Sequence, residues 1–200
     1  MKLGRNVISI GILAIILIFV FWGCSGYNGL VSQDETVKKA WNNVNAEYQN
    51  RADLVPNLVN TVKGAANFEQ ETLTRVIEAR AKATSIQLKA EDLTPENMAK
   101  FEQAQAELSG ALSRLLVTVE RYPDLKAVKG FQDLQAQLEG IENNIKNSRK
   151  MFNESINTYN VKVRSFPMNL LSGMFGFKVK EGFQAEAGSE KAPKVDFEKK

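Results

Sequence analysis

The sequence contains no histidine and only one cysteine, Cys24, among its 200 residues. Without histidine, Ser-His-Asp and Cys-His catalysis, histidine-ligated zinc and the Glu-x-x-His motif of di-iron helical bundles are all excluded. A single cysteine cannot form an intramolecular disulfide or a cysteine metal cluster. Neither common type of Gly-rich phosphate-binding loop is present. We therefore find no credible active site and expect no catalytic residues, no bound metal or cofactor and no small-molecule substrate.

Charge is scarce at the N-terminus and balanced elsewhere. The net charge is +3, but Lys2 and Arg5 are the only charged residues before Asp34, so the remainder of the chain carries only +1. The sequence has no basic block and no alternation of aromatic and basic residues. Such patterns are typical of proteins that bind nucleic acids. We therefore expect no nucleic-acid partner.

A long apolar run follows the two N-terminal cations. Residues 7–22 are all apolar except Ser9 and Gly11, and the uncharged run continues to Leu30. A helix over residues 7–22 reaches ~24 Å, short of the ~30 Å hydrocarbon core, so a spanning helix must extend into that continuation. We predict a membrane anchor over residues 1–26. Because the cations precede the run, we expect a single-pass protein of the cell inner membrane with its bundle in the periplasm.

The same residues also resemble a lipoprotein-type signal, which would end at Gly23-Cys24. In that alternative Cys24 is lipidated and becomes the mature N-terminus. Phe21 and Trp22 stand where such signals usually have an aliphatic and a small residue, so we favour an uncleaved anchor. Both alternatives keep the rest of the chain tethered to a membrane.

The rest of the chain predicts an all-α fold, an elongated antiparallel bundle of about four long helices in residues 27–167. Apolar residues at three- and four-residue spacing place the helices at 33–50, 56–89, 95–121 and 131–166. We expect Pro56 to occupy the first turn of the second helix or to kink it, with Asp53 capping it from just upstream. Trp41 and Tyr48 lie on an apolar stripe and are predicted core residues.

Residues 168–200 have a different character. They begin with an apolar, Gly-containing stretch, residues 170–177, that is too short to span a bilayer. We favour docking of this stretch on the bundle over insertion into the membrane surface or partner binding. The charged tail from Gln184 onwards is predicted to be disordered. In the preceding helix, the many asparagines, Asn153 and Asn160 among them, are predicted to form a polar outer face.

Two sets of charged residues are candidates for chemistry. Arg51 and Asp53 form either a binding or catalytic pair, or a helix cap and a surface ion pair worth ~0–1 kcal/mol, and we favour the second interpretation. Asp53, Glu69 and Glu78 could serve as acid, base or ligands of a hard cation without histidine. This carboxylate hypothesis of a hydrolase or metal-binding protein is the less favoured one.

Several specific motifs lie between Tyr27 and Phe183. They are Tyr27-Asn28-Gly29-Leu30, Ala40-Trp41, the run from Arg51 to Lys63 that includes Asp53, Pro56 and Asn57, then Glu69, Tyr122-Pro123, Phe166-Pro167 and Phe175-Gly176-Phe177. Together these motifs resemble the bacterial LemA family over almost the whole chain.

The resemblance implies an elongated all-α bundle behind an N-terminal membrane anchor, with no established enzymatic activity. The wider family reaches into magnetosome membranes, which hints at membrane organisation, and some relatives are thought to expose the bundle to the cytoplasm. Our leading hypothesis is a non-catalytic, membrane-tethered interaction or scaffold module that binds an unknown protein partner or itself. The alternative is a membrane-organising or remodelling protein that uses residues 170–177.

Overall fold

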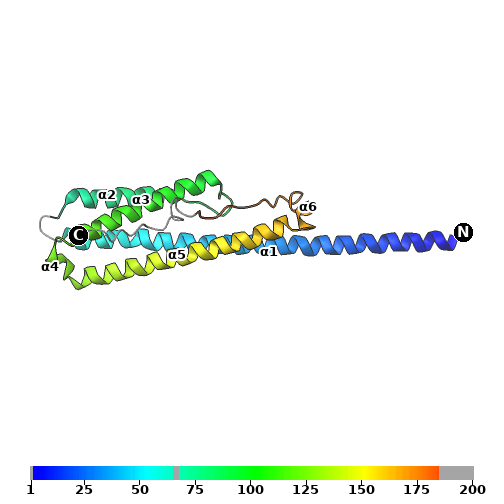
Figure 1. Cartoon of the computed structure of the whole chain (residues 1–200), viewed down its shortest axis with the longest axis horizontal. Helices are drawn as coiled ribbons and strands as arrows, with labels where there is room; N and C mark the ends of the chain where they lie inside the picture. Colours follow the sequence, from blue (N-terminus) through cyan, green and yellow to red (C-terminus); the bar gives the residue numbers. More distant parts are fainter. Residues whose placement is uncertain (1, 65–67, 185–200) are drawn as a thin grey trace, which may run out of the picture.

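The chain is entirely helix and loop in the part that a computed structural model describes, residues 2–64 and 68–184, with side chains described from Ile10 onwards except residue 19. The helices in this part are α1 (Lys2–Lys63), α2 (Gln70–Ser85), α3 (Pro95–Val119), α4 (Pro123–Lys126), α5 (Lys129–Arg164) and α6 (Met168–Ser172). Figure 1 shows two antiparallel pairs, α1 with α5 and α2 with α3, stacked as two layers. The predicted all-α, elongated fold is confirmed.

Helix α1 is the spine of the molecule. It is a single helix of 62 residues, which at ~1.5 Å per residue is ~93 Å long. Its first third projects beyond the bundle, and the rest packs along α5 (Figure 1). The predicted helix start at Pro56 is wrong, and so is the predicted division into helices 33–50 and 56–89. The real boundary follows Lys63, and α2 begins at Gln70.

Pro56 is tolerated inside α1 because the hydrogen bond that it cannot make is replaced. Proline has no N–H to donate to the carbonyl four residues earlier, which here belongs to Ala52. The Nε of Arg80, on α2, donates to that carbonyl at 2.7 Å. Pro56 itself is exposed. Asp53, predicted to cap a helix, instead lies within α1, where its Oδ1 accepts a hydrogen bond from Gln49 at 2.8 Å.

The other predicted helix ends agree closely with the structure. Thr94 is the N-cap of α3, and its hydroxyl oxygen accepts a hydrogen bond from the Asn97 N–H at 3.2 Å. Helix α3 ends at Val119, shortly before Pro123, and α5 occupies nearly the predicted range. The short α4 between them was not predicted.

The core forms two apolar clusters along the bundle. One lies at the end far from the apolar span and joins α1, α2 and α3 through residues such as Leu58, Val76, Leu108 and Leu115. The other lies closer to the span and is rich in aromatic residues. In it, Trp41 contacts the rings of Phe101 and Phe152, with centroids 5.4 and 5.2 Å away. Trp41 and Tyr48 are both buried, which confirms the core prediction.

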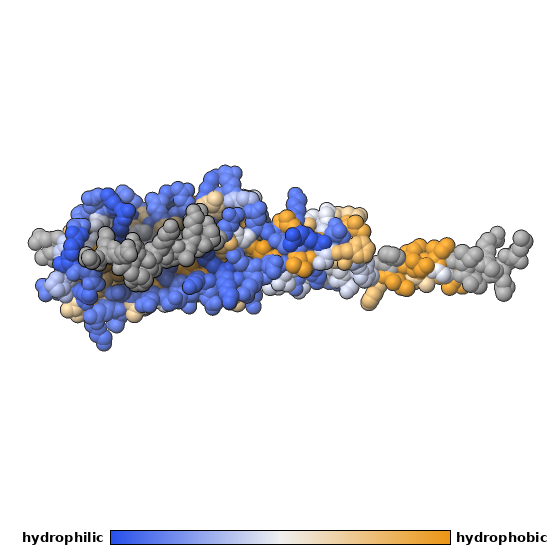
Figure 2. Space-filling view, viewed as in Figure 1, coloured by the Kyte–Doolittle hydropathy of each residue, from blue (hydrophilic) through white to orange (hydrophobic). Residues whose placement is uncertain are grey.

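The projecting part of α1 is exposed and apolar. Ile10, Leu13, Leu17 and Phe21 are each more than half exposed. Figure 2 shows a hydrophobic band on the part of the molecule that projects beyond the bundle. Among the described helices, α1 alone is long and apolar enough to cross a membrane, with an 18-residue window of mean hydropathy 2.2 and none of that window buried. This agrees with the predicted transmembrane helix.

The segment after Pro167 docks only in part. Met168 and Phe183 are buried, and Leu171 and Phe177 pack beside them against α1 and α5. Other apolar side chains of the segment remain exposed. The charged tail was predicted to be disordered from Gln184 onwards; Gln184 is the last described residue, and residues 185–200 lie outside the described residues.

Candidate functional site

Arg51 is the most deeply buried charged residue described, with 1% of its surface exposed. Its Nη1 donates to the Ser109 hydroxyl at 2.5 Å and to the Glu142 carboxylate at 2.9 Å. Its Nη2 donates to the backbone and side-chain oxygens of Gln105 at 3.1 and 2.7 Å. One guanidinium therefore joins α1, α3 and α5. Both interpretations of an Arg51–Asp53 pair are wrong, because the buried Arg51 side chain pairs with Glu142 of α5, whose carboxylate reaches the surface.

The surroundings of Arg51 suit a structural junction. A buried charge is tolerated only when it is paired and hydrogen-bonded, and here Glu142 supplies the opposite charge. The Tyr48 ring lies 5.1 Å from the guanidinium carbon, and burial raises the pKa of Tyr48 despite the opposing effect of Arg149 and Arg51. Only Nε of Arg51 is buried without a hydrogen-bond partner. The cluster holds three helices in one register.

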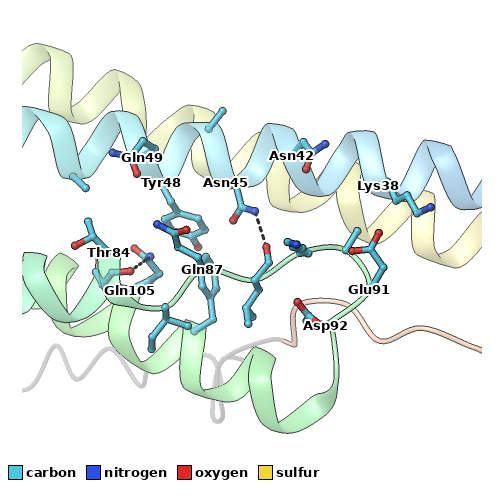
Figure 3. A pocket seen from close by; sticks show the side chains of 18 residues that line it. Lys38, Asn42, Asn45, Tyr48, Gln49, Thr84, Gln87, Glu91, Asp92 and Gln105 are labelled. Carbon is cyan, nitrogen blue, oxygen red and sulfur yellow. Dashed lines mark hydrogen bonds between the residues drawn. The ribbon is translucent and has the colours of Figure 1, made fainter.

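A groove of about 710 Å³ lies beside this junction, between α1 and the connection from α2 to α3. Figure 3 shows its polar lining from α1 and from that connection. Two groove residues, Tyr48 and Gln105, also contact Arg51. The connection is held by α1, since Trp41 Nε1 and Asn45 Nδ2 both donate to the Leu88 carbonyl, at 2.8 and 3.1 Å. The charged and amide- or hydroxyl-bearing residues that line the groove, besides Tyr48, are Lys38, Asn42, Asn45, Gln49, Thr84, Gln87, Lys89, Glu91, Asp92 and Gln105.

The structure does not bring the remaining family-motif residues into one site. Asn57 is exposed and lines a shallow groove between α1 and α5 together with Asp53. Lys63 is exposed in the last turn of α1, where the helix dipole favours a cation. Glu69 precedes α2 and pairs with Arg121 at 3.0 Å. These residues are spread over the half of the molecule far from the apolar span.

The three carboxylates of the metal or hydrolase hypothesis are also apart. Glu69 and Glu78 line a groove between α2 and α3, together with Arg75 and Arg114, whereas Asp53 lines the α1–α5 groove. Within residues 2–64 and 68–184, no group of three or more acidic or cysteine side chains is placed to hold a metal ion. The geometry gives this hypothesis no support.

An extended segment, residues 177–184, forms the most specific contacts outside the helices, and we call it the arm. Asn160 of α5 pairs with the backbone of Lys180: its Nδ2 donates to the carbonyl at 2.8 Å and its Oδ1 accepts from the N–H at 2.9 Å. Asn153 pairs in the same way with the backbone of Phe183, at 2.9 Å in both directions. Two asparagines on one helix face thus bind an extended backbone.

The predicted polar outer face of α5 is therefore wrong at these two positions. Asn153 and Asn160 are seven residues apart, so they share one face of the helix. Asparagine is only a modest helix former, and two at this spacing were a signal that sequence reasoning passed over.

Side chains of the arm add further contacts. The Phe183 ring stacks on Trp41 with centroids 6.0 Å apart, and the Arg149 guanidinium lies 4.3 Å from its centroid. Lys180 pairs with Asp34 of α1 at 3.0 Å and lies 5.4 Å from the centroid of the Tyr159 ring. Burial acts to raise the pKa of Asp34, but Lys180 and Lys38 outweigh it and hold that pKa below its ordinary value. Burial, reinforced by Asp34, raises the pKa of Tyr159 to about 12.

An apolar edge remains exposed at the end of the bundle from which the α1 span projects (Figures 1 and 2). Phe166 and Met174 are 80% exposed and Leu170 is 64% exposed. Phe175 lies against Tyr27 of α1, with ring centroids 5.1 Å apart, which places this edge at the level where the span joins the bundle. Cys24, the candidate lipidation site, is exposed three residues before Tyr27.

Comparison with known proteins gives consistent results. The model of the LemA family matches residues 40–197. The magnetosome proteins MamQ 1 and MamQ 2 of Paramagnetospirillum magneticum AMB-1 are each 24% identical to this chain, over 94% of it and 77% of their own length. Protein LemA of Metamycoplasma hominis is 24% identical over 78% of this chain and 67% of its own. None of these relatives carries the name of an enzyme.

Proposed function

The chain belongs to the LemA family, and from this premise and its structure we propose that it is a non-catalytic interaction or scaffold module anchored in the bacterial inner membrane. Family membership and the apolar N-terminal helix are consistent with a membrane-associated helical protein. The scaffold role, the absence of catalysis and the identity of the membrane are parts of the proposal.

The observation that carries the proposal is the continuity of α1. The exposed apolar span and the buried spine belong to one helix, and its first fully buried residue is Leu30. From Leu30 to Lys63 the helix is ~51 Å long, so the bundle is held upright at a fixed height instead of hanging from a flexible linker. Anchoring raises the effective concentration of such a module toward partners in the same membrane.

A non-catalytic role is supported by how the polar interior is used. The hydrogen bonds and ion pair of Arg51 join helices to one another, and those of Asn153 and Asn160 hold the arm. Catalytic groups, by contrast, are expected to converge on a cavity with perturbed pKa values.

We further propose that the bundle is periplasmic and that α1 crosses the membrane once. Lys2 and Arg5 precede the apolar run, and cations are retained on the cytoplasmic side. Protease treatment of spheroplasts should digest the bundle from outside, and the intact mass should include residues 1–23. Protection until lysis would place the bundle in the cytoplasm. A mass that lacks residues 1–23 and carries a lipid would show a lipidated Cys24.

Crosslinking in native membranes tests the interaction role. A photoreactive residue in place of Asn42, which is exposed in the groove of Figure 3, should trap one defined protein or a second copy of the chain. Lys150, exposed on α5, is the control position. Recovery of uncrosslinked monomer alone from both positions would count against the proposal.

The exposed apolar edge supports a second candidate, a membrane-organising function. Phe166, Leu170 and Met174 lie at the end of the bundle where the span leaves it. Apolar side chains at this level lower their free energy by entering the lipid interface. Reconstitution into liposomes, with vesicle size and clustering measured by light scattering, tests this candidate. Vesicles unchanged by the protein would contradict it.

A further inference from the structure

The arm and its groove have the properties of a bound peptide and its binding site. The arm is extended, and α5 contacts its backbone through paired donors and acceptors at Lys180 and Phe183. Pairs of this kind recognise an extended main chain whatever its side chains, so they supply affinity but little specificity. We use the name arm groove for the surface formed by Asp34, Trp41, Arg149, Phe152, Asn153, Tyr159 and Asn160.

Specificity comes from three positions of the arm. Phe183 is 7% exposed and lies between Trp41 and Phe152, with Arg149 against its ring. Lys180, three residues earlier, pairs with Asp34. A Cβ on Gly182 would collide with the Oδ1 of Asn153, a short side chain that both of its hydrogen bonds to Phe183 hold in place. The groove therefore accepts the pattern Lys-x-Gly-Phe in an extended chain.

The contacts do not require the arm to belong to the same molecule. The arm joins the bundle through a turn that contains Gly176, whose φ of 78° is readily adopted only by glycine. Met174, just before it, is 80% exposed. A different path of this turn would break its own backbone hydrogen bonds, such as that from the Phe177 N–H to the Ser172 carbonyl, but would leave the contacts of Lys180 and Phe183 with the groove unchanged. Exchange of an identical element between two copies costs little, because both arrangements contain the same contacts beyond the turn.

We propose that the arm groove also binds the arm of a second copy of this chain, so that neighbouring molecules in one membrane exchange arms. Asp34 and Trp41, which contact the arm, lie close to the end of the apolar span in α1. Two anchored copies thus present arm and groove at the same height, and confinement to the membrane raises their effective concentration. This inference rests on the proposed interaction role and names the second copy as the partner.

Complementation between two full-length variants tests the exchange. In the groove variant, Asn153→Asp with Asn160→Asp keeps the side-chain size but places a carboxylate against each arm carbonyl. In the arm variant, Gly182→Val introduces the collision with Asn153. The groove variant has an intact free arm and the arm variant has an intact empty groove. Gly173→Ala is the matched control, because a Cβ there meets nothing within 4 Å.

The two variants are co-expressed with different tags and extracted in mild detergent, and their helix content is checked by circular dichroism. We expect several-fold more co-purification of the groove variant with the arm variant than of either variant with itself. An added peptide with the sequence of residues 177–184 should abolish the excess. Co-purification of the mixed pair at the level of the same-variant pairs overturns the proposal.

Insensitivity of the excess to the peptide also overturns it, because association then occurs through another surface. If crosslinks from Asn42 persist while complementation fails, arm exchange is excluded and the interaction role stands. If both fail, the interaction role fails as well.

Discussion

The Arg80 side chain donates to the Ala52 carbonyl at 2.7 Å, the carbonyl that Pro56 leaves without an intrahelical donor. A residue of α2 thus completes the hydrogen bonding of α1. An unsatisfied buried carbonyl is costly, and Ala52 is 2% exposed. This replacement explains how one helix passes through a proline and still serves as the spine of the bundle.

Arg80→Met should lower the free energy of unfolding by about 1 kcal/mol, because the Ala52 carbonyl loses its donor. In a Pro56→Ala background the N–H of residue 56 can bond that carbonyl, so the same Arg80→Met change should cost much less. Denaturation of the full-length proteins in detergent, monitored by circular dichroism, gives the free energy of unfolding of each of the four proteins in this double-mutant cycle. Equal costs in both backgrounds would show that Arg80 does not replace the missing bond.

Arg51→Met should be among the most damaging single substitutions, with a loss of about 3 kcal/mol, because it leaves the buried Oε1 of Gln105 without its Arg51 donor and removes the hydrogen bonds that join three helices. Glu142→Gln should cost only about 1 kcal/mol, since an amide oxygen can still accept from Arg51. Arg75→Ala is the control: Arg75 is exposed and, among the described residues, forms its ion pair with Glu71 of its own helix, and we expect less than about 0.5 kcal/mol. If Arg51→Met lowered the free energy of unfolding by no more than Arg75→Ala, Arg51 would not be the structural junction between α1, α3 and α5.

Lowering the pH should weaken the attachment of the arm, because protonation of Asp34 removes its ion pair with Lys180. The folded-state pKa of Asp34 is lowered, since Lys180 and Lys38 outweigh the effect of burial. A lowered carboxyl pKa contributes stability above the ordinary value of ~3.9, and this is lost as the pH falls through the folded-state value. The charged and titratable groups that face Asp34 are Lys38 on α1, Lys180 on the arm and Tyr159 on α5.

The readout is the fluorescence of Trp41, which stacks on Phe183 of the arm, in a Trp22→Phe background. We expect a change as the pH falls below the ordinary aspartate pKa of ~3.9 and through the lowered folded-state pKa of Asp34, and no such change in Asp34→Asn. Burial raises the pKa of Glu102. Protonated Glu102 therefore contributes to folding stability at low pH, and this contribution is lost as the pH rises through the raised pKa, which is the opposite pH dependence to that of Asp34. Glu102→Gln separates the two effects. An identical acid profile with and without Asp34 would contradict the assignment.

The apolar edge should lie in the lipid interface. In a Cys24→Ser background, Met174→Cys carries an environment-sensitive fluorophore, and Val128→Cys, 45% exposed in the connection before α5 at the far end of the bundle, is the control. In liposomes, nitroxide-labelled lipid should quench the label strongly at position 174 and hardly at position 128. Equal quenching at the two positions would mean that the edge does not reach the bilayer.

Much of the fold follows from local signals in the sequence. The apolar periodicity of α3 and α5 concerns neighbours along one helix, and the helices predicted from it were confirmed. The helix start predicted at Pro56 was wrong because the group that compensates for this proline, Arg80, is 24 residues away in sequence. Gly64, directly after the last residue of α1, was the local signal for the true break.

The polar contacts were harder to predict from the sequence for the same reason. The partners of Arg51 lie 54 to 91 residues away, so no local pattern could distinguish a buried junction from a surface ion pair. Asn153 and Asn160 contact arm residues that are 30 and 20 residues away, respectively, and their role depends on the chain folding back over α5. Here the sequence predicted a polar face without indicating what would cover it.

The uninterrupted course of α1 also makes the molecule a lever. In the proposed arrangement the helix that crosses the bilayer is also the one on which the bundle packs, so a change in its tilt would rotate the whole bundle relative to the membrane surface. A tilt of ~10° over the ~51 Å between Leu30 and Lys63 displaces the far end by ~9 Å. Helix tilt responds to the mismatch between apolar length and bilayer thickness. In that arrangement a change in local bilayer thickness would therefore move Lys63 sideways above the membrane.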